Sequence, residues 1–225
     1  MVILGVDAYK KGWVAVELTD GAYSGARFSD DLRTLLGGAP KAEVVAVDMP
    51  LGLLEEGWRQ ADTAAKAVLG PRANSVFRVP PRGVWQQKDY TAASLLCQRL
   101  TGSGLSQQTW GLAAKLKAAN ECLKDVEGRL FEVHPEVSFW ALNGSAPLPH
   151  TKKTWAGQMQ RRSLLRKGGV VLPDDLGATG QVPPDDILDA AAAAWSAHRI
   201  AQGLAISLPG TPQLDRHKQP IAIWY

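Results

Sequence analysis

Residues 2–7 read Val-Ile-Leu-Gly-Val-Asp, and residues 44–48 read Val-Val-Ala-Val-Asp. Both are short aliphatic runs that end in an aspartate. Continuous apolar runs of this length are typical of central strands that are covered on both faces of a sheet. Ligands of open α/β sheets bind at the edge where such strands end. The two runs therefore predict an α/β fold in which Asp7 and Asp48 lie along one edge of the sheet.

The segments around these runs predict a β-β-β-α-β order for the first part of the chain. The additional elements are strands at 13–18 and 23–28, joined by the hairpin signal Asp20-Gly21, and a short helix that Asp30 or Ser29 caps and Gly37-Gly38 ends. Later elements are helices at 57–69, 90–100, 106–126, 155–167 and 185–203, strands at 130–133 and 221–225, and loops at 73–88, 143–154 and 174–184. If the helix at 106–126 is interrupted, the interruption is expected near Gly111. We expect a single domain over residues 1–225, with a helical insertion at about 53–128 between the fourth and fifth strands.

Composition limits the class of protein. The chain has 225 residues, of which 45% are hydrophobic and 21% charged, as in an average soluble domain. Its two cysteines, Cys97 and Cys122, lie in no metal-binding or disulfide pattern and are expected to be reduced thiols. No apolar run approaches the roughly 20 residues needed to span a bilayer, and the N-terminus lacks the charge order of a signal peptide. These features predict a cytoplasmic protein.

The net charge of +3 permits a polyanionic partner without requiring one. Basic residues gather in two regions of the sequence. These are Arg59, Lys66, Arg72, Arg78, Arg82 and Lys88 in the first region, and Lys152, Lys153, Arg161, Arg162, Arg166 and Lys167 in the second. Each region is either a surface that binds nucleic acid or an ordinary solvated helix face.

The helix expected at 185–203 is apolar nearly all round, so it should be buried. Asp185 is its natural N-cap. Asp186 and Asp189 lie one turn apart on the same face. Asp186 can simply favour the helix dipole, but an ionised Asp189 inside the apolar stretch costs several kcal/mol or more unless a cation compensates it.

Asp7, Asp48 and Asp189 indicate a metal site only when they are considered together. Taken alone, each strand-end aspartate can serve only a turn. Three carboxylates at adjacent positions would repel one another without a cation between them. Hard divalent cations take carboxylate oxygens and retain waters that phosphate oxygens can replace. The sequence therefore predicts an Mg²⁺ or Mn²⁺ site, in which two ions about 3.5–4 Å apart would activate water and stabilise a leaving 3′-oxygen.

The chain also resembles a known family over nearly its whole length. The blocks that carry the resemblance are GVDAYKKGWVAV, AVDMPLGL, SVFRVPPR, TGSGLSQQTW, FEVHPEVSF, HTKKT, DDILDAAAAAW and the terminal AIWY. They resemble the DUF429 family of predicted ribonuclease H-fold nucleases. The resemblance implies a ribonuclease H-like, five-stranded mixed sheet of order 3-2-1-4-5 with helices on both faces. It also implies a metal-dependent nuclease site.

Within that superfamily, Asp7 matches the acid of the first strand, Asp48 the acid that ends the fourth, and Asp189 the acid of the last helix. The fourth acid departs from the ribonuclease H pattern, because the first helix offers only Asp30 and Asp31 near its start. Glu132 or Glu136 is the candidate for that position, and a site with one metal ion and a site with two both stay open. The further catalytic candidates are Glu132, Glu136 and His134, and the further metal candidate is Asp186. The substrate-binding candidates are Arg78, Arg82, Lys115, Lys152 and Lys153. For His134 and for the basic residues, a purely structural role stays open.

Three functions are compatible with these residues. The first is hydrolysis of phosphodiester bonds in nucleic acid by a metal-dependent nuclease. The second is a phosphotransferase like the actin and sugar-kinase enzymes, which would need a second such domain and Gly-rich phosphate loops. The third is a non-catalytic domain that binds nucleic acid or a nucleotide. A basic side chain beside Asp189, without an open cavity, would favour the third.

Overall fold

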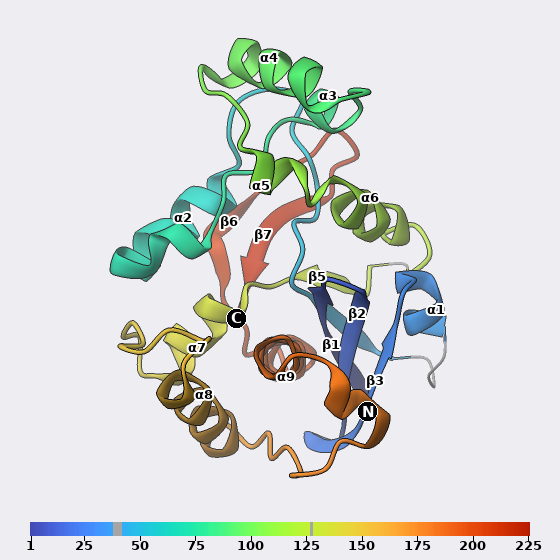
Figure 1. Cartoon of the computed structure of the whole chain (residues 1–225), viewed down its shortest axis with the longest axis vertical. Helices are drawn as coiled ribbons and strands as arrows, with labels where there is room; N and C mark the ends of the chain where they lie inside the picture. Colours follow the sequence, from blue (N-terminus) through green and yellow to red (C-terminus); the bar gives the residue numbers. More distant parts are fainter. Residues whose placement is uncertain (38–41, 127) are drawn as a thin grey trace.

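The computed structural model describes residues 1–37, 42–126 and 128–225. Its main sheet has five strands in the order β3-β2-β1-β4-β5 (Figure 1). The strands are β1 (Val2–Tyr9), β2 (Gly12–Thr19), β3 (Ala22–Ser29), β4 (Val44–Val47) and β5 (Leu130–Glu132). β1 pairs antiparallel with β2 and parallel with β4, and β4 pairs parallel with β5. The predicted α/β class and mixed strand order are confirmed.

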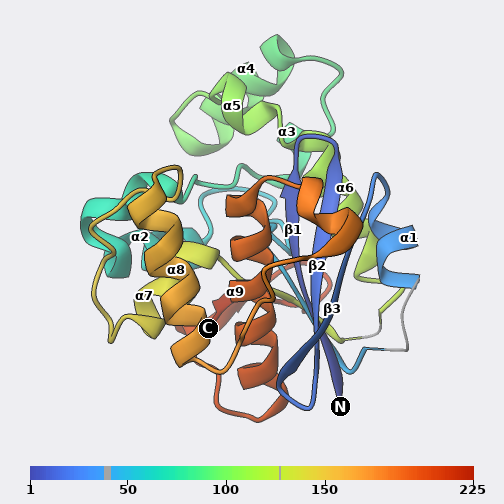
Figure 2. The same cartoon turned by 60° about the horizontal axis from the view of Figure 1, so that its bottom comes forward.

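Helices cover both faces of this sheet (Figures 1 and 2). On one face α9 (Pro184–Ala201) lies against the strands, with α7 (Pro135–Leu142) and α8 (Trp155–Lys167) packed outside it. On the other face lie α1 (Leu32–Gly37) and α6 (Ala113–Cys122). No described helix is long and apolar enough to cross a membrane.

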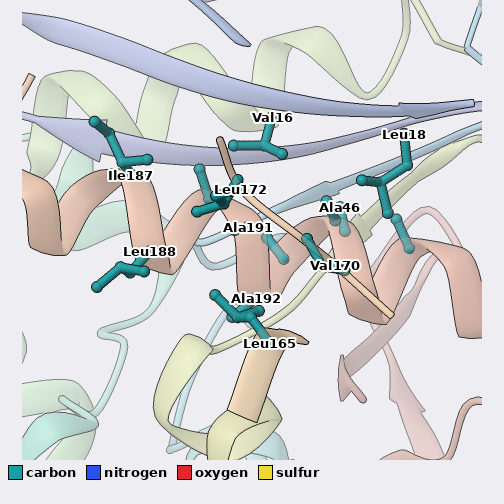
Figure 3. Packing of buried hydrophobic residues seen from close by; sticks show 14 of the residues in the cluster. Val16, Leu18, Ala46, Leu165, Val170, Leu172, Ile187, Leu188, Ala191 and Ala192 are labelled. Carbon is teal, nitrogen blue, oxygen red and sulfur yellow. The ribbon is translucent and has the colours of Figure 1, made fainter. Parts of the chain in front are cut away.

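The alternation of side chains along each strand decides which residues meet α9. Ile3 belongs to the core on the α9 side, whereas Leu4 and Val6 belong to the core on the other side. In β4, Ala46 faces α9 and Val47 faces away. Figure 3 shows Ala191 and Ala192 of α9 packed among the larger side chains of the α9 side.

Gly5 allows α9 to approach the sheet closely. A Cβ atom on Gly5 would lie 1.9 Å from the backbone N of Ala194 and 2.2 Å from the carbonyl O of Ala190. The helix backbone therefore rests directly on β1. Small residues are required on both sides of this contact, which accounts for the alanine run of α9.

The segment between β4 and β5 is mostly helical. It contains α2 (Gln60–Leu69), the 3₁₀ helix η1 (Gly70–Ser75), α3 (Arg82–Trp85), α4 (Tyr90–Thr101), α5 (Gln107–Trp110) and α6. Figure 2 shows α3, α4 and α5 gathered at the end of the molecule where β1 ends and α9 begins. This segment therefore lies beside the sheet edge that carries the strand-end aspartates.

The C-terminal residues form a separate antiparallel hairpin of β6 (Ser207–Leu214) and β7 (Pro220–Trp224). An isolated parallel bridge joins Val133, the residue after β5, to Trp224 of β7. The end of β7 therefore lies beside the end of β5, at the edge of the main sheet. Ile221 and Ile223 of β7 pack against the alanine face of α2. The sequence predicts β7 but not β6, because Pro209, Gly210 and Pro212 interrupt the strand pattern of β6.

Several predicted elements differ from the structure. The sequence predicts no helix at 135–142, yet α7 forms there, and Pro135 fits its first position because the proline φ suits a helix. The predicted loop at 73–88 contains the end of η1 and the single turn of α3. The predicted helix at 106–126 is interrupted at Gly111 and Leu112, the expected place, and forms two helices, α5 and α6. A short 3₁₀ helix, η2 (Gly177–Gln181), lies in the predicted loop at 174–184.

Two predicted helix caps are wrong. Asp31, not Asp30 or Ser29, caps α1, since its Oδ2 accepts a hydrogen bond of 2.7 Å from the Thr34 N–H. Asp185 lies inside the first turn of α9, whose N-cap position is Pro183. The predicted stop of α1 at Gly37-Gly38 falls partly on Gly38, which lies outside the described residues.

Candidate metal centre

Asp7, Asp48 and Asp189 each place a carboxylate oxygen within 4.8 Å of the oxygens of the other two. Asp7 and Asp189 are buried, with exposed fractions of 4% and 2%, and Asp48 is half-buried. They come from the end of β1, the residue after β4 and the first half of α9. We call these three residues the acidic triad.

Strand alternation and register bring Asp7 and Asp48 together. Each lies two residues beyond a position that faces α9, Gly5 in β1 and Ala46 in β4. Val6 is paired with Val47, and the N–H of Asp48 donates to the carbonyl of Val6 at 2.8 Å. The two carboxylates therefore leave neighbouring strands at the same level and on the same face.

Asp189 reaches them because α9 crosses β1 in the opposite direction (Figure 2). Asp189 precedes Ala190, whose carbonyl would meet a side chain at Gly5. Moving from Gly5 towards Asp7 along β1 corresponds to moving from Ala190 towards the start of α9. The Gly5 contact thus sets the separation between Asp7 and Asp189.

Burial and mutual repulsion oppose ionisation of the acidic triad. Burial, followed by the charges of Asp48 and Asp189, raises the pKa of Asp7 well above its ordinary value. Burial raises the pKa of Asp189 to about 7, although the nearby Lys152 lowers it. Burial also raises the pKa of Asp48, against the lowering influence of His134 and Lys152. An added cation would relieve this repulsion.

Two lysines of the loop before α8 contact the first half of α9. The Lys152 ammonium lies 2.5 Å from Asp189 Oδ2 and 3.9 Å from Asp185 Oδ2. The Lys153 ammonium lies 2.5 Å from Asp185 Oδ2. Asp186 is half-buried, and burial together with the charge of Asp185 raises its pKa. The predicted metal candidate Asp186 therefore lies beside the acidic triad but not within it.

A buried arginine fixes the loop that carries these lysines. Arg161 of α8 is fully buried and forms an ion pair with Glu136 of α7. Its guanidinium also donates to the carbonyl of His150 at 3.2 Å. The predicted catalytic candidate Glu136 is thus the ion-pair partner of Arg161, which in turn binds the loop at His150, two residues before Lys152.

A cavity of about 240 Å³ opens beside the acidic triad. Its lining includes Asp7, Asp48 and His134, together with the segment Ser75–Phe77 of the insertion. His134 Nε2 lies 3.3 Å from the Ser75 carbonyl, and its buried Nδ1 has no hydrogen-bond partner among the described residues. The structure therefore places the predicted candidate His134 in the same cavity as two members of the acidic triad.

Glu132 leaves the sheet on the opposite face. It is paired with Val47, which faces away from α9, and its Oε2 accepts a hydrogen bond of 2.7 Å from the Leu51 N–H. Its Oε1 lies 2.5 Å from the buried Arg59 guanidinium, which is also 3.3 Å from Asp62. Burial raises the pKa of Glu132 to about 7, and Arg59 opposes this shift. The carboxylate is thus committed to an internal ion-pair network at the rim of the cavity.

The remaining basic candidates lie apart from the acidic triad. The Arg78 guanidinium lies 5.6 Å above the Trp58 ring, beside a second cavity of about 220 Å³. Arg82 pairs with Glu55 at 3.1 Å and with Asp215 at 3.6 Å.

Lys115 lies closer to the triad. Its ammonium donates to the Gly12 carbonyl at 2.5 Å and lies 4.6 Å above the Trp13 ring. Burial lowers the pKa of Lys115, and the charge of Asp7 raises it. Its side chain is thus fixed near the β1–β2 turn, within the electrostatic reach of Asp7.

Asp185 and Arg161 are two residues whose roles the sequence does not predict. Asp185 is interpreted as a helix cap, although its spacing of four residues from Asp189 places both carboxylates on one helix face. That spacing was the available signal. Nothing in the sequence separates Arg161 from its solvated basic neighbours, because its burial depends on the packing of α7 against α8.

The residues present fit a hard divalent cation. The donors of the acidic triad are all carboxylate oxygens, which Mg²⁺ and Mn²⁺ prefer to the nitrogen and sulfur donors typical of zinc. Asp189 Oδ1 is buried and has no hydrogen-bond partner among the described residues. An unsatisfied buried carboxylate oxygen is costly, and a metal ion would satisfy it.

The chain matches a protein family over most of its length. Residues 5–214 match the DUF429 family, described as a protein of unknown function. No curated protein matches the chain. No solved structure matches it either. The matched span contains the acidic triad, Lys152 and the whole main sheet from Gly5 onward, and the chain belongs to the DUF429 family.

Proposed function

We propose that this protein has a ribonuclease H-like fold and is a metal-dependent nuclease that hydrolyses phosphodiester bonds of nucleic acid. The observation that carries the proposal is the acidic triad, with its carboxylate oxygens within 4.8 Å of one another at a cavity. The strand order β3-β2-β1-β4-β5 and the origin of the three acids from β1, β4 and α9 support it.

Asp7, Asp48 and Asp189 would hold Mg²⁺ or Mn²⁺. When bound, such an ion polarises phosphoryl oxygens and lowers the pKa of water. The chain supplies the rest of the site. The Gly5 contact fixes the separation of Asp7 and Asp189, while burial limits exchange with bulk water. His134, whose Nδ1 has no partner among the described residues, can hold or release a proton inside the cavity.

A polyanionic substrate fits the surroundings of the cavity. Lys152 and Lys153 project from one anchored loop, and Lys115 lies near the β1–β2 turn. Asp185 and Asp189 now neutralise the two loop lysines, so their charges become available to phosphate only if these pairs loosen. Lysines bind phosphate groups as point charges without base preference. The proposed contacts therefore suit a phosphate-containing substrate such as nucleic acid and give no preference for its sequence.

The test is a cleavage assay with labelled single-strand, duplex, hybrid and branched nucleic acids in the presence of Mg²⁺ or Mn²⁺. We expect cleavage of at least one substrate, its loss in EDTA, and a decrease of at least about 10²-fold in Asp7→Asn and Asp48→Asn. Glu43→Gln, at an exposed acid beside Val2 at the opposite end of β1 from Asp7, is the matched control and should retain activity. Equal cleavage by wild type and Asp7→Asn would refute the proposal.

A non-catalytic nucleic-acid-binding domain is the second candidate. The observation that favours it is the Lys152–Asp189 ion pair, which compensates the buried carboxylate without any metal. The cavity beside Asp7 and Asp48 favours the nuclease instead, because a purely structural pair needs no opening. Binding of nucleic acid that is unaffected by EDTA and by Asp7→Asn, without cleavage, would select this second candidate.

A further inference from the structure

Neighbouring lysines on one loop have different relations to the acidic triad. Lys152 has a side chain that is 36% exposed, and its ammonium contacts Asp189 directly. Lys153 has a side chain that is 72% exposed and pairs with Asp185, which is not part of the triad. Lys153 is therefore a matched control for Lys152, because both lysines lie on the same loop but only Lys152 contacts the triad.

The Lys152 ammonium supplies a positive charge beside the three carboxylates of the acidic triad. In the described part of the chain, it is the only basic side chain that forms an ion pair with a member of the triad. Asp7 and Asp48 form no ion pair with the described residues. The ammonium therefore provides the local compensation that the three carboxylates require, and it does so where a divalent cation would bind.

Neighbouring contacts fix the backbone around Lys152, whereas its side chain is partly exposed. Arg161 binds the carbonyl of His150 on one side. On the other side, the Thr154 hydroxyl donates to the carbonyl of Thr151 at 2.9 Å, and a Cβ on Gly157 would lie 1.9 Å from that same oxygen. Movement of Lys152 away from Asp189 therefore requires rotation of its flexible side chain and no rearrangement of the loop.

We propose that Lys152 is an exchangeable internal cation that occupies the acidic triad in the metal-free protein, leaves Asp189 when a divalent ion binds, and then contacts a phosphate of the nucleic-acid substrate. The inference rests on the proposed metal centre. An ammonium and a divalent ion bound to the same carboxylate repel each other, so the binding of both to Asp189 would weaken the binding of each. Lys153, whose partner is Asp185, takes no part in the exchange.

Calorimetric titration of Mn²⁺ into wild type, Lys152→Gln and Lys153→Gln tests the exchange. Lys152→Gln should bind Mn²⁺ on the order of tenfold more tightly than wild type, as for one pKa unit of removed interaction. Lys153→Gln should remain close to wild type. Equal or weaker binding by Lys152→Gln overturns the inference. Absence of Mn²⁺ binding by wild type overturns the proposed metal centre instead, which separates the two failures.

A measurement on the wild-type protein avoids any folding defect of the variants. Labelling of lysine amines, followed by mass spectrometry, should modify Lys152 several-fold faster in Mg²⁺ than in EDTA, because the ammonium becomes free. Lys153 should be labelled at the same rate in both conditions. A Lys152 rate that Mg²⁺ leaves unchanged or slows contradicts the exchange.

The phosphate contact is tested with a fluorescent oligonucleotide of the class that wild type cleaves, at saturating Ca²⁺ to prevent turnover. Lys152→Gln should bind it more weakly and reduce the slope of log affinity against log salt by about one, as for loss of one phosphate contact. Lys152→Arg should restore the slope. An unchanged slope in Lys152→Gln shows that Lys152 does not reach the phosphate and overturns this part of the inference.

Discussion

Asp7 shows why the acidic triad is a poor arrangement for stability alone. It is 4% exposed, and its neighbours within reach include two further carboxylates. A carboxyl whose pKa is raised in the folded state favours folding at low pH, and this contribution is lost as the pH rises through the folded-state pKa. For Asp189 that pKa is about 7, and that of Asp7 is raised as well.

Asp7→Asn should therefore stabilise the metal-free protein. The reason is that the amide removes a buried charge and its repulsion from Asp48 and Asp189. In EDTA the melting temperature of wild type should fall between pH 6 and pH 8, while that of Asp7→Asn should change less and lie a few degrees higher at pH 8, as about 1 kcal/mol implies. A lower melting temperature for Asp7→Asn at pH 8 in EDTA would contradict the repulsion.

Metal binding should depend on pH for the same reason. Protons on Asp7 and Asp189 compete with a divalent ion, since the ligand oxygens must be deprotonated to bind. Mn²⁺ affinity should rise between pH 6 and pH 7.5 by up to about tenfold per pH unit for each proton that the ion displaces. Calorimetry in buffers of different ionisation enthalpy should show proton release on binding. Affinity that is constant over this range, with no proton release, would be inconsistent with the triad as the site.

At the scale of elements, β1 and α9 determine the site through their contact at Gly5. The Gly5 position lacks room for a side chain, since the Ala194 N would be 1.9 Å from its Cβ. A displaced α9 would move Asp189 away from Asp7. The alanine run of α9 is therefore part of the construction of the site as well as of the core.

Gly5→Ala should destabilise the protein by about 1–3 kcal/mol or more and weaken Mn²⁺ binding, because the added methyl meets helix backbone. Gly25→Ala in β3 is the matched control, since a Cβ there meets nothing within 4 Å. Denaturant unfolding and Mn²⁺ titration of both variants give the comparison. If the two variants unfold alike, α9 does not rest on Gly5 as described.

The sequence predicts elements better than it predicts register. The apolar runs that end in Asp7 and Asp48 identify two central strands, and their shared face follows once the pairing of Val6 with Val47 is known. Glu132 also ends a strand, but it is paired with Val47 rather than with Asp48, so it faces the other side. The face of the sheet on which a strand-end side chain lies depends on the register between strands that are distant in the sequence. Local sequence does not specify that register.

At the scale of the whole molecule, two segments of the insertion border both small cavities. Phe77 and Gln108 line the cavity beside the triad. Their neighbours Arg78 and Thr109 line the second cavity. The second cavity therefore adjoins the first along the insertion. If the protein binds nucleic acid as proposed, we expect a strand at the triad to extend towards Arg78.

Arg78→Ala should weaken oligonucleotide binding several-fold and reduce its salt slope by about one, while Mn²⁺ affinity remains unchanged. Arg78 is exposed and stacks on Trp58 rather than contacting the triad, so its substitution should affect oligonucleotide binding and leave Mn²⁺ binding unchanged. Arg99→Ala, an exposed arginine of α4, is the control. Fluorescence anisotropy at several salt concentrations would detect the difference. Identical binding by Arg78→Ala and Arg99→Ala would place the strand elsewhere.

Tertiary packing explains the parts of the molecule that the sequence does not predict. The helix α7 lacks a polar face that would give it a helical pattern, since Pro135, Val137, Ser138 and Phe139 are all buried. Arg161 is buried because α7 supplies Glu136 opposite it. Both features depend on contacts between α7, α8 and α9, whereas the triad acids carry a local signal of their own.

The most direct test of the metal centre is an anomalous difference map from crystals of the wild-type protein soaked in Mn²⁺. We expect a peak bounded by Asp7, Asp48 and Asp189, with metal–oxygen distances of roughly 2.2 Å, in the range of hard divalent cations, and with Lys152 turned away from Asp189. A map with no peak at the triad, and Lys152 still paired with Asp189, would contradict the account.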